Sequence, residues 1–303
     1  MATRIHEFFG FRATDHSLTA VDHAQRGECP FLGDTCIKTL RDGVIAGVCT
    51  LKPATSDPVI CCPVRLYADD YRILRDVADK AFGAGLPLYP GASAVREARH
   101  TGSEVIAVFG KRWGGELHLP QRQGTGAYFV DWILARLSTS GILVEFVAVE
   151  VQSIDTTGNY QGARLALLDP ARQVVPATAG FNWENVNKRI LPQLIYKGNV
   201  LQREQLCLKG LFFVTPTPVF NRVMSRLGGQ AVLLPYPMQS SSITFMAYDV
   251  DPAAAQDPGW PQPLALQHVH TTNVGQLAQA FAGPGVMPPQ DVYQRAIRQA
   301  LAP

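Results

Sequence analysis

Two apolar runs joined by a polar turn are the feature of this sequence that most constrains its fold. Residues 127–137 (AYFVDWILARL) and 142–155 (ILVEFVAVEVQSID) have the composition of strands, and residues 138–141 (STSG) between them favour a turn. We therefore expect an antiparallel hairpin. Because both faces of these runs are largely apolar, the hairpin is expected to lie in a sheet that is covered on both sides.

Acidic side chains interrupt this hairpin. With residues 140–141 as the loop, the register pairs three sets of residues: Leu137 with Val144, Ile133 with Ala148, and Asp131 with Glu150. Gln152 shares the face of Glu150, because alternate residues of a strand point the same way. Carboxylates placed opposite each other repel, so this register favours a divalent cation between them. A shifted loop would change the pairs, and the alternative is a hairpin whose acids face solvent.

The rest of the chain carries both helical and strand patterns, which indicates a mixed α/β fold. A helix is expected to begin at Asp69 or Asp70, either of which can cap it, and to end at Gly83. Short apolar runs predict three further strands, and the end of the chain suggests a helix; these segments are residues 105–109, 211–214, 243–248 and 290–301.

Length and composition exclude several classes of protein. At 303 residues, with 47% hydrophobic and 17% charged residues, the chain can bury a full core as one large domain or two moderate ones. This balance excludes wholesale disorder and a fibre. No run approaches the roughly 18 uncharged apolar residues of a membrane helix, and no export signal is evident, so we expect a cytoplasmic protein without a membrane partner. The net charge of +2 does not indicate a nucleic-acid binder, but a local basic groove remains compatible with it.

Five of the six cysteines fall between residues 29 and 62, and Cys207 stands apart. In a cytoplasmic chain this clustering, set among turn-forming residues, favours a metal over disulfides. Four thiolates suit zinc or a single iron. The spacing lacks paired Cys-x2-4-Cys knuckles, and adjacent Cys61 and Cys62 point to opposite faces of an extended segment, so only one of them is expected to face the metal. The alternative is a set of buried free thiols that pack as small apolar side chains.

These features occur together with short segments of distinctive sequence: Cys29-Pro30-Phe31, Cys36-Ile37-Lys38, Gly47-Val48-Cys49, Ile60-Cys61-Cys62-Pro63-Val64-Arg65, Val130-Asp131-Trp132, and Glu150-Val151-Gln152 running into Asp155-Thr156-Thr157-Gly158-Asn159-Tyr160. An acid on one strand followed by Glu-x-Lys on the next is similar to the PD-(D/E)xK nuclease core, although Gln152 stands here at the Lys position. The combination more closely resembles the NotI-type restriction endonuclease family, in which the Glu-x-Gln variant also occurs. The resemblance covers most of residues 25–165.

The resemblance implies a role for each matching residue. Asp131 and Glu150 would hold a catalytic Mg2+, and Gln152 would face the attacking water or the scissile phosphate. Glu116, fifteen residues before Asp131, matches a further acid of the family site, although its position alone is equally compatible with a solvent-facing side chain. The family's four-cysteine site, implied to hold iron with zinc as the alternative, matches Cys29, Cys36, Cys49 and Cys62. Cys62 is preferred to Cys61 because the family pattern runs Cys-Pro-x-Arg, and a closed site of four thiolates is expected to be structural.

The resemblance further implies a type II restriction endonuclease. Such a homodimer would use Mg2+ to hydrolyse both strands of double-stranded DNA at a GC-rich palindrome, beside a companion DNA methyltransferase. Gln offers only a hydrogen bond where Lys would offer a charge. We therefore expect the metal, or a nearby cation such as Lys111 or Arg112, to provide more of the stabilisation of the charge on the phosphate. Basic and polar candidates for DNA contact are Lys111, Arg112, Arg122, Asn159, Tyr160, Arg164, Lys188 and Arg189.

The expected organisation has three parts. Residues 1–66 would form an N-terminal segment with the four-cysteine metal-binding module. Residues 67–250 would form a PD-(D/E)xK nuclease core, a mixed central sheet flanked by helices, and residues 251–303 a loop and helix packed on the core or a dimer partner. Two alternatives stay open: a non-cleaving DNA-binding protein with a Cys-rich metal module, and an iron–thiolate electron carrier. Neither alternative needs Asp131, Glu150 and Gln152 on one face.

Overall fold

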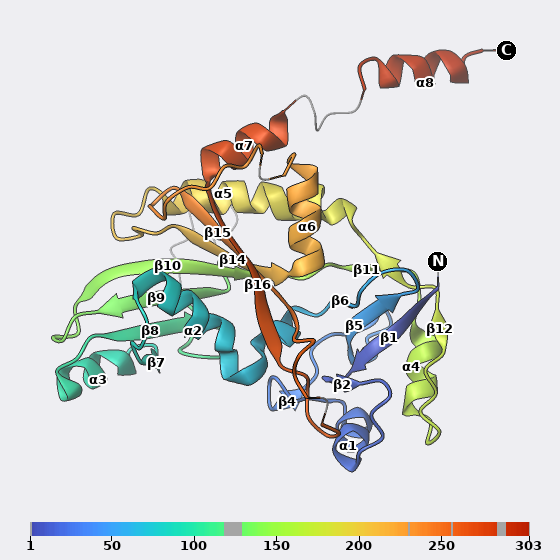
Figure 1. Cartoon of the computed structure of the whole chain (residues 1–303), viewed down its shortest axis with the longest axis horizontal. Helices are drawn as coiled ribbons and strands as arrows, with labels where there is room; N and C mark the ends of the chain where they lie inside the picture. The colour runs from blue at the N-terminus through green and yellow to red at the C-terminus, as the bar shows by residue number, and fades with distance from the viewer. Residues whose placement is uncertain (1, 118–128, 230, 256, 284–288, 303) are drawn as a thin grey trace.

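A seven-stranded mixed sheet forms the centre of the molecule (Figure 1). The computed structural model describes the whole chain apart from residues 1, 118–128, 230, 256, 284–288 and 303. The strand order is β16-β15-β14-β10-β9-β8-β7. In chain order these strands are β7 (Leu88–Pro90), β8 (Val105–Gly110), β9 (Trp132–Leu137), β10 (Leu143–Val151), β14 (Leu211–Pro216), β15 (Ser242–Val250) and β16 (Leu264–Asn273).

The predicted strands and the mixed character of the sheet are confirmed. β8, β14 and β15 contain the three short apolar runs in which we expected strands. β10 pairs in parallel with β14 and antiparallel with β9, while β14 and β15 are parallel and β15 and β16 antiparallel. The parallel pairs require long crossovers, which the helices between these strands provide.

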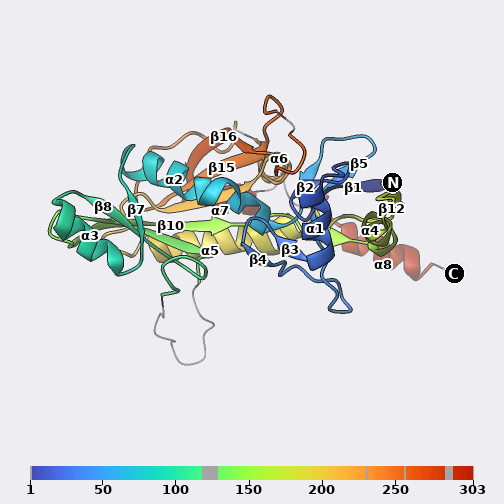
Figure 2. The same ribbon diagram turned by 90° about the horizontal axis from the view of Figure 1, so that it is seen from below.

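Helices cover both faces of this sheet (Figures 1 and 2). On one face α2 (Ala68–Phe82) packs against Val147 and Val149 of β10. On the other, α5 (Leu191–Leu201), α6 (Thr217–Arg226) and α7 (Val274–Ala282) pack against the core that contains Ala148. Alternate residues of β10 therefore enter opposite cores, as its continuous apolar sequence predicts. A smaller helix, α3 (Ser93–Thr101), packs beside β7 and β8.

The hairpin forms with most of the predicted register. Ile133 pairs with Ala148 as expected, and Trp132 pairs with Val149. Nearer the turn the register shifts between Leu143 and Glu145, so Leu137 pairs with Leu143 and not with Val144. An irregularity of this kind adds a residue to one strand and re-aims the side chains beside it.

The predicted helix near residue 70 also forms, with a different beginning. It ends at Gly83 as expected. Neither Asp69 nor Asp70 caps it, because both residues and Tyr71 have φ between 54° and 57°, a left-handed turn that precedes the regular helix. Such a turn in non-glycine residues is unfavourable by itself and persists where the surrounding packing holds it.

A second, smaller sheet lies beside the first, at the right of Figure 1. It contains β1 (Thr3–Phe8), β2 (Phe11–Arg12), β5 (Val48–Pro53), β6 (Val59–Ile60) and β12 (Pro176–Ala177). Because β12 pairs with β1, this N-terminal part takes in residues far beyond position 66. Short elements complete this part: α1 (Leu18–Arg26), β3 (Glu28–Cys29), β4 (Asp34–Thr35), the 3-10 helix η1 (Pro63–Tyr67), β11 (Thr156–Thr157), α4 (Gln161–Leu168) and β13 (Gly180–Phe181).

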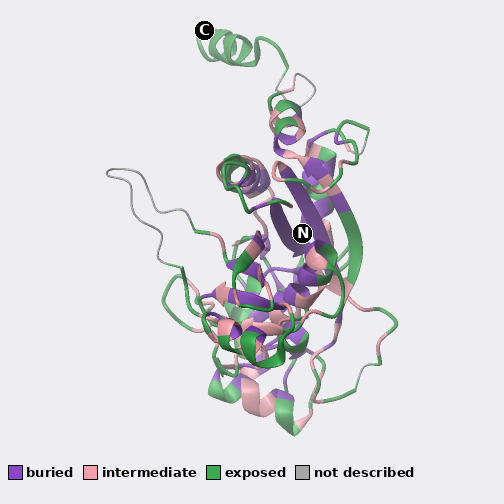
Figure 3. Cartoon of the chain, turned by 90° about the vertical axis from the view of Figure 1, so that its left-hand side faces the viewer, coloured by how far each residue is buried: buried purple, intermediate pink, exposed green. Residues whose placement is uncertain are grey.

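The large sheet also continues past residue 250, where we expected the core to end. β16 pairs along its whole length with β15, and α7 packs into the same core. The terminal helix forms as α8 (Val292–Ala300), but every residue of it is exposed (Figure 3). Its packing on a dimer partner therefore stays a prediction. No helix in the described part of the chain is long and apolar enough to cross a membrane.

Candidate functional site

Two carboxylates meet at the open end of the hairpin. Asp131 directly precedes β9, and Glu150 is the last residue but one of β10. The regular ladder ends at Trp132, so Asp131 makes no backbone pair with Glu150; its carboxylate accepts a hydrogen bond from the Val151 N–H at 2.7 Å. The side chain of Asp131 is thereby held against the strand that carries Glu150, as the predicted register requires.

A lysine from another element reaches this pair. Nζ of Lys197, on α5, lies 2.6 Å from Oε1 of Glu150, and the side chains of the two residues are 18% and 10% exposed. The second oxygen of Glu150, Oε2, is buried and has no hydrogen-bond partner among the described residues. A buried carboxylate oxygen without a partner is unfavourable, so this atom favours a proton or a further cation.

Burial and mutual repulsion both act on the pKa values of this pair. Burial, reinforced by the charge of Asp131 and opposed by that of Lys197, raises the pKa of Glu150 to about 7. Asp131 lies at an exposed position, yet desolvation by neighbouring protein atoms raises its pKa as well, against the effect of the Val151 hydrogen bond and of Lys197. One ammonium group therefore does not fully compensate two carboxylates that share a partly dry site.

Gln152 directly follows β10 on the face of Glu150. Its backbone is fixed, because its N–H donates to the Val214 carbonyl at 3.0 Å and its carbonyl accepts from Oγ1 of Thr215 at 2.8 Å. Its half-buried side chain makes no hydrogen bond to another described residue. The amide is thus placed by the sheet and is free to contact a bound molecule.

Aromatic side chains pack next to the site, in the core on the α2 face of the sheet. Nε1 of Trp132 donates to the hydroxyl of Tyr67 at 3.3 Å, and their ring centroids are 5.6 Å apart. Burial and the nearby charge of Asp131 raise the pKa of Tyr67. Trp132 fits closely over Gly110, where a Cβ would collide with the indole ring. This packing holds the residue that follows Asp131 in the core on the α2 face of the sheet.

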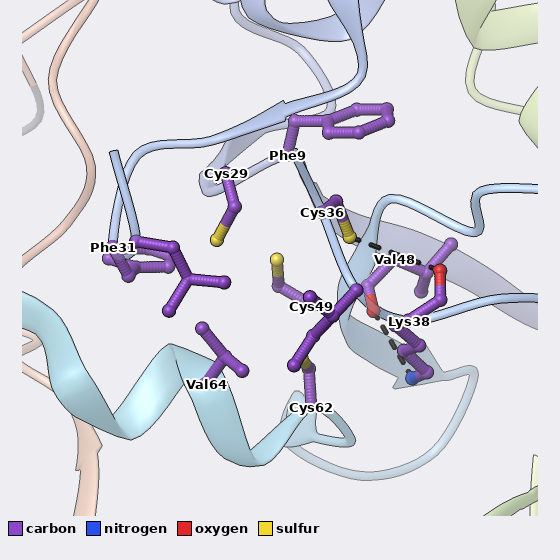
Figure 4. A pocket seen from close by; sticks show the side chains of 11 residues that line it. Phe9, Cys29, Phe31, Cys36, Lys38, Val48, Cys49, Cys62 and Val64 are labelled. Carbon is purple, nitrogen blue, oxygen red and sulfur yellow. Dashed lines mark hydrogen bonds between the residues drawn. The ribbon is translucent and has the colours of Figure 1, made fainter. Parts of the chain in front are cut away.

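Four of the five clustered cysteines line one small cavity (Figure 4). It has a volume of about 10 Å³, and its cysteines are Cys29, Cys36, Cys49 and Cys62. Figure 4 shows the sulfur atoms of Cys29 and Cys49 facing the same space. The thiol of Cys36 is turned toward the Lys38 carbonyl, 4.0 Å away. As placed, no three His, Cys, Asp or Glu side chains of the described residues form a group that could hold a metal ion.

Cys61 does not line this cavity. Its Sγ lies 3.4 Å from Nζ of Lys38 and 3.5 Å from the carbonyl oxygen of Cys49. Adjacent Cys61 and Cys62 thus point to different sides of the segment, as expected for an extended chain. Cys29, Cys36, Cys49 and Cys62 thus line one cavity, Cys61 lies outside it, and the choice of metal ligands stays a prediction.

The cavity is dry. Cys29, Cys49 and Cys62 are buried, and Phe31, Val48 and Val64 complete much of its lining. Burial raises the pKa of Cys29 to about 11 and raises the pKa of Cys49 and Cys62. Without a cation these thiols therefore keep their protons, and any metal that binds them must displace protons.

Comparison with known proteins identifies the family. A model of the NotI restriction endonuclease family matches residues 15–229, more than two thirds of the chain. The chain belongs to the NotI restriction endonuclease family. It is accordingly a site-specific deoxyribonuclease that binds double-stranded DNA, and its family suggests a type II restriction endonuclease. A comparison with curated proteins found no match.

Glu116, the further acid expected in a NotI-family site, is not assembled with the others. Glu116 is exposed, and no hydrogen bond or ion pair joins it to another described residue. The cations that we expected beside the carboxylates, Lys111 and Arg112, lie exposed in the turn after β8. Neither forms an ion pair with Asp131 or Glu150; Lys197 takes that place.

The candidate DNA contacts of this NotI-family chain fall into three groups. Lys111, Arg112, Lys188 and Arg189 are exposed, the last paired with Asp155 at 2.7 Å. Two residues are engaged within the protein: Nε of Arg164 donates to the Ile45 carbonyl at 2.7 Å, and Oδ1 of Asn159 accepts from the Gln161 N–H at 2.7 Å. Tyr160 is only 6% exposed in the N-terminal core, so it offers no surface for DNA. Arg122 lies outside the described residues.

Sequence reasoning missed Lys197 and Tyr67. For Lys197 a signal existed, because it is the one charged residue in the eleven-residue helix LPQLIYKGNVL. A lone charge on an otherwise apolar and neutral helix needs a buried partner. Tyr67 carries no comparable signal, since an aromatic residue near a helix is usually part of a core.

Proposed function

We propose that this NotI-family chain is a type II restriction endonuclease with a PD-(D/E)xK core, which hydrolyses both strands of double-stranded DNA at a GC-rich palindrome in a Mg2+-dependent reaction. The observation that carries the proposal is the pair formed by Asp131 and Glu150 at the open end of the hairpin. Neither a simple binding protein nor an electron carrier requires two carboxylates whose mutual repulsion is left incompletely compensated.

The chemistry of this pair suits Mg2+. Carboxylate oxygens are the hard ligands that Mg2+ prefers. Oε2 of Glu150 is buried and unpartnered, and a cation held between Glu150 and Asp131 would satisfy it. When bound, Mg2+ would lower the pKa of a water molecule and neutralise charge on the phosphate.

The remaining residues of the site position the reactants. The Gln152 amide, fixed through its backbone and free at its side chain, can donate a hydrogen bond to a phosphate oxygen or accept one from the attacking water. Glu116 is proposed as the further acid because of the family resemblance. In this proposal the exposed segment that carries Glu116 approaches the carboxylates when DNA binds.

The four-cysteine cavity is proposed to hold a structural iron or zinc ion. Its fit rests on the donor set: Cys29, Cys36, Cys49 and Cys62 surround one small, dry cavity, and the chemistry of four sulfur donors suits either metal. The Cys36 thiol has to turn from the Lys38 carbonyl to complete the set. A closed site of this kind has no open position for water, so its contribution is to the stability of the N-terminal part.

We further propose a homodimer, because cleavage of both strands at a two-fold site is matched by a two-fold protein. A companion DNA methyltransferase would protect the host's own sites. The proposed DNA contacts are the exposed basic residues Lys111, Arg112, Lys188 and Arg189, together with Arg122, Asn159 and Arg164; Tyr160 is left out because it is buried.

The test is cleavage of GC-rich plasmid and genomic DNA by purified protein, with and without added Mg2+. We expect discrete fragments with Mg2+ and none without it. Asp131→Ala and Glu150→Ala should each abolish cutting, whereas Asp79→Asn, at an exposed position of α2, should cut as the wild type does. DNA that is bound and left intact on every substrate would favour the non-cleaving alternative, and fragments unaffected by both carboxylate variants would refute the assignment of the site.

A further inference from the structure

The side chain of Lys197 lies beside the acidic pair, and it comes from α5, an element that is not part of the nuclease motif. Lys197 lies in the middle of α5, and its Nζ contacts Oε1 of Glu150 at 2.6 Å. No other Lys or Arg of the described residues forms an ion pair with Glu150 or Asp131. The position is deep, since the Lys197 side chain is 18% exposed. A solvated surface lysine would not be fixed in this way.

The reaction proposed above requires a positive charge that the motif itself does not supply. Negative charge grows on the phosphate oxygens as the water oxygen bonds to phosphorus, and a positioned cation stabilises that charge. In the PD-(D/E)xK pattern this cation would follow the Glu by two positions, where the present chain has neutral Gln152. The exposed Lys111 and Arg112 make no ion pair at the carboxylates. Lys197 is therefore the cation that the fold itself brings to the site.

The backbone of Lys197 is held tightly in place. The adjacent Gly198 lies against Val274 and Ile243, and a Cβ at this glycine would collide with the Val274 side chain. Leu194 and Leu201 bury the same face of α5 in the core. Because the helix cannot move away from the sheet, the long side chain of Lys197 is the part that can change its contacts. The ammonium can thus exchange Glu150 for a phosphate oxygen without a movement of α5.

We propose that Lys197 is a catalytic residue of this site and supplies from α5 the charge that a lysine at position 152 would supply from the strand. The proposal rests on the proposed nuclease function. In the free protein the ammonium neutralises Oε1 of Glu150. With DNA bound it donates a hydrogen bond to a non-bridging oxygen of the scissile phosphate. Lys197 keeps its proton throughout: the attacking water gives one proton to solvent as its oxygen bonds to phosphorus, the bond between phosphorus and the leaving oxygen breaks, and the leaving oxygen takes one proton from a second solvent water.

The experiment compares wild-type protein with Lys197→Met, Lys197→Arg and the double variant Lys197→Met/Gln152→Lys. The single-turnover cleavage rate with Mg2+ and the affinity for the same DNA without added Mg2+ are measured for each. Lys197→Met should cut at least about 100-fold more slowly, the loss typical of one missing transition-state donor, with DNA affinity changed by less than about threefold. The double variant should recover at least a tenth of the wild-type rate. Lys80→Met, at an exposed position of α2, is the matched control.

The rescue separates catalysis from a structural role. A lysine at position 152 shares the face of Glu150 and can also contact its carboxylate, so the melting temperature of each variant is measured beside its cleavage rate. Recovery of the rate in the double variant, without recovery of a melting temperature lost in Lys197→Met, assigns the charge to the phosphate. Loss of cutting without recovery in either Lys197→Arg or the double variant would leave only a structural role and overturn the proposal, as would undiminished cutting by Lys197→Met. Where Lys197→Met fails to fold, Lys197→Gln, which keeps a hydrogen-bond donor without the charge, replaces it. Wild-type protein that cuts no DNA refutes the proposed function itself, and this inference with it.

Discussion

The acidic site and the four-cysteine cavity differ in what surrounds their potential metal ligands. Asp131 is exposed at the sheet edge, and Glu150 beside it keeps one oxygen without a partner. The cavity of the cysteines is closed, with a volume of about 10 Å³ and an apolar lining that includes Val48 and Val64. An open site can admit water and a phosphate, whereas a closed one can only be filled by its own ligands and a metal.

The two sites also differ in how their negative charge is neutralised or avoided. At the acidic site Lys197 already neutralises one oxygen of Glu150, so the carboxylates tolerate the absence of a metal. At the cavity the thiols avoid charge by keeping their protons, since burial raises the pKa of Cys29 to about 11. Lys38, the nearest ammonium, donates to the carbonyl oxygen of Cys61 at 2.8 Å. Substitution of a cavity cysteine should therefore lower the stability of the protein, whereas substitution of Glu150 in the absence of a metal should raise it.

The two regions are joined by one short element. η1 begins directly after Cys62 and ends at Tyr67, whose hydroxyl contacts Trp132 beside Asp131. Arg65, between them, is fully buried and pairs with Glu7 of β1 at 2.9 Å. A buried ion pair of this kind is costly to break from one side. The N-terminal part is thus connected through Tyr67 to the residue that follows Asp131, although the two sites share no ligand.

The largest effect should follow from the loss of a cavity ligand. If the proposed iron or zinc ion occupies the cavity, Cys62→Ser should release it and lower the free energy of unfolding by more than about 4 kcal/mol, the range reached when a structural metal is lost. Denaturant unfolding gives the stability, and elemental analysis of the purified protein gives the metal content per chain.

Cys61→Ser is the matched control, because Cys61 is equally buried and adjacent in sequence but lies outside the cavity. It should keep the metal and lose less than about 2 kcal/mol. Metal retained in Cys62→Ser and lost in Cys61→Ser would assign the fourth ligand to Cys61. Protein that contains no metal before any substitution would show that the cavity holds only packed thiols.

A smaller effect is expected in the pH dependence of the acidic site. The pKa of Glu150 is raised to about 7 by burial and by Asp131, so below pH 7 a proton occupies the carboxyl that is proposed to bind Mg2+. The Mg2+ concentration for half-maximal cleavage should be nearly constant above pH 8 and should rise up to about tenfold per pH unit below pH 7. Cleavage rates titrated with Mg2+ between pH 5.5 and 8.5 measure it. A Mg2+ requirement that is flat over this range would contradict the raised pKa.

Much of the fold follows from local patterns in the sequence. The hairpin register was predicted through Ile133 and Ala148 because the apolar runs are long and the turn between them is well marked. The shift at Glu145 was not predicted. Glu145 is buried between Arg136 at 2.9 Å and Lys209 at 2.9 Å, and Lys209 is distant in sequence. A register that depends on such a distant partner cannot be derived from the hairpin alone.

In the candidate site, too, contacts between residues close in sequence could be predicted and contacts between distant residues could not. Asp131, Glu150 and Gln152 could be placed together from the alternation of one hairpin. Lys197 could not, because it reaches Glu150 only after β14 pairs in parallel with β10 and α5 packs across the sheet. Lys111 and Arg112 were favoured for their closeness in sequence, and they lie in an exposed turn. Sequence reasoning succeeds here for contacts within one supersecondary unit and fails for contacts that the crossover helices create.

The smallest expected effect concerns the stability of the acidic site, which should change in the direction opposite to that of the cavity. In the folded chain the pKa of Glu150 lies above its ordinary value of 4.5, so between about pH 4.5 and 7 the folded state binds more protons than the unfolded state. Stability without Mg2+ therefore falls as pH rises through this interval.

Glu150→Gln removes the negative charge of Glu150, while its amide oxygen can still accept a hydrogen bond from Lys197. In Mg2+-free buffer it should raise the melting temperature by roughly 2–4 °C at pH 8, as about 1 kcal/mol does in a chain of this size, and by much less at pH 5. Thermal unfolding at the two pH values measures the difference. A Glu150→Gln protein that melts below the wild type at pH 8 would show that the ion pair with Lys197 outweighs the repulsion from Asp131, and the acidic site would then depend on its ligands for stability just as the cavity does.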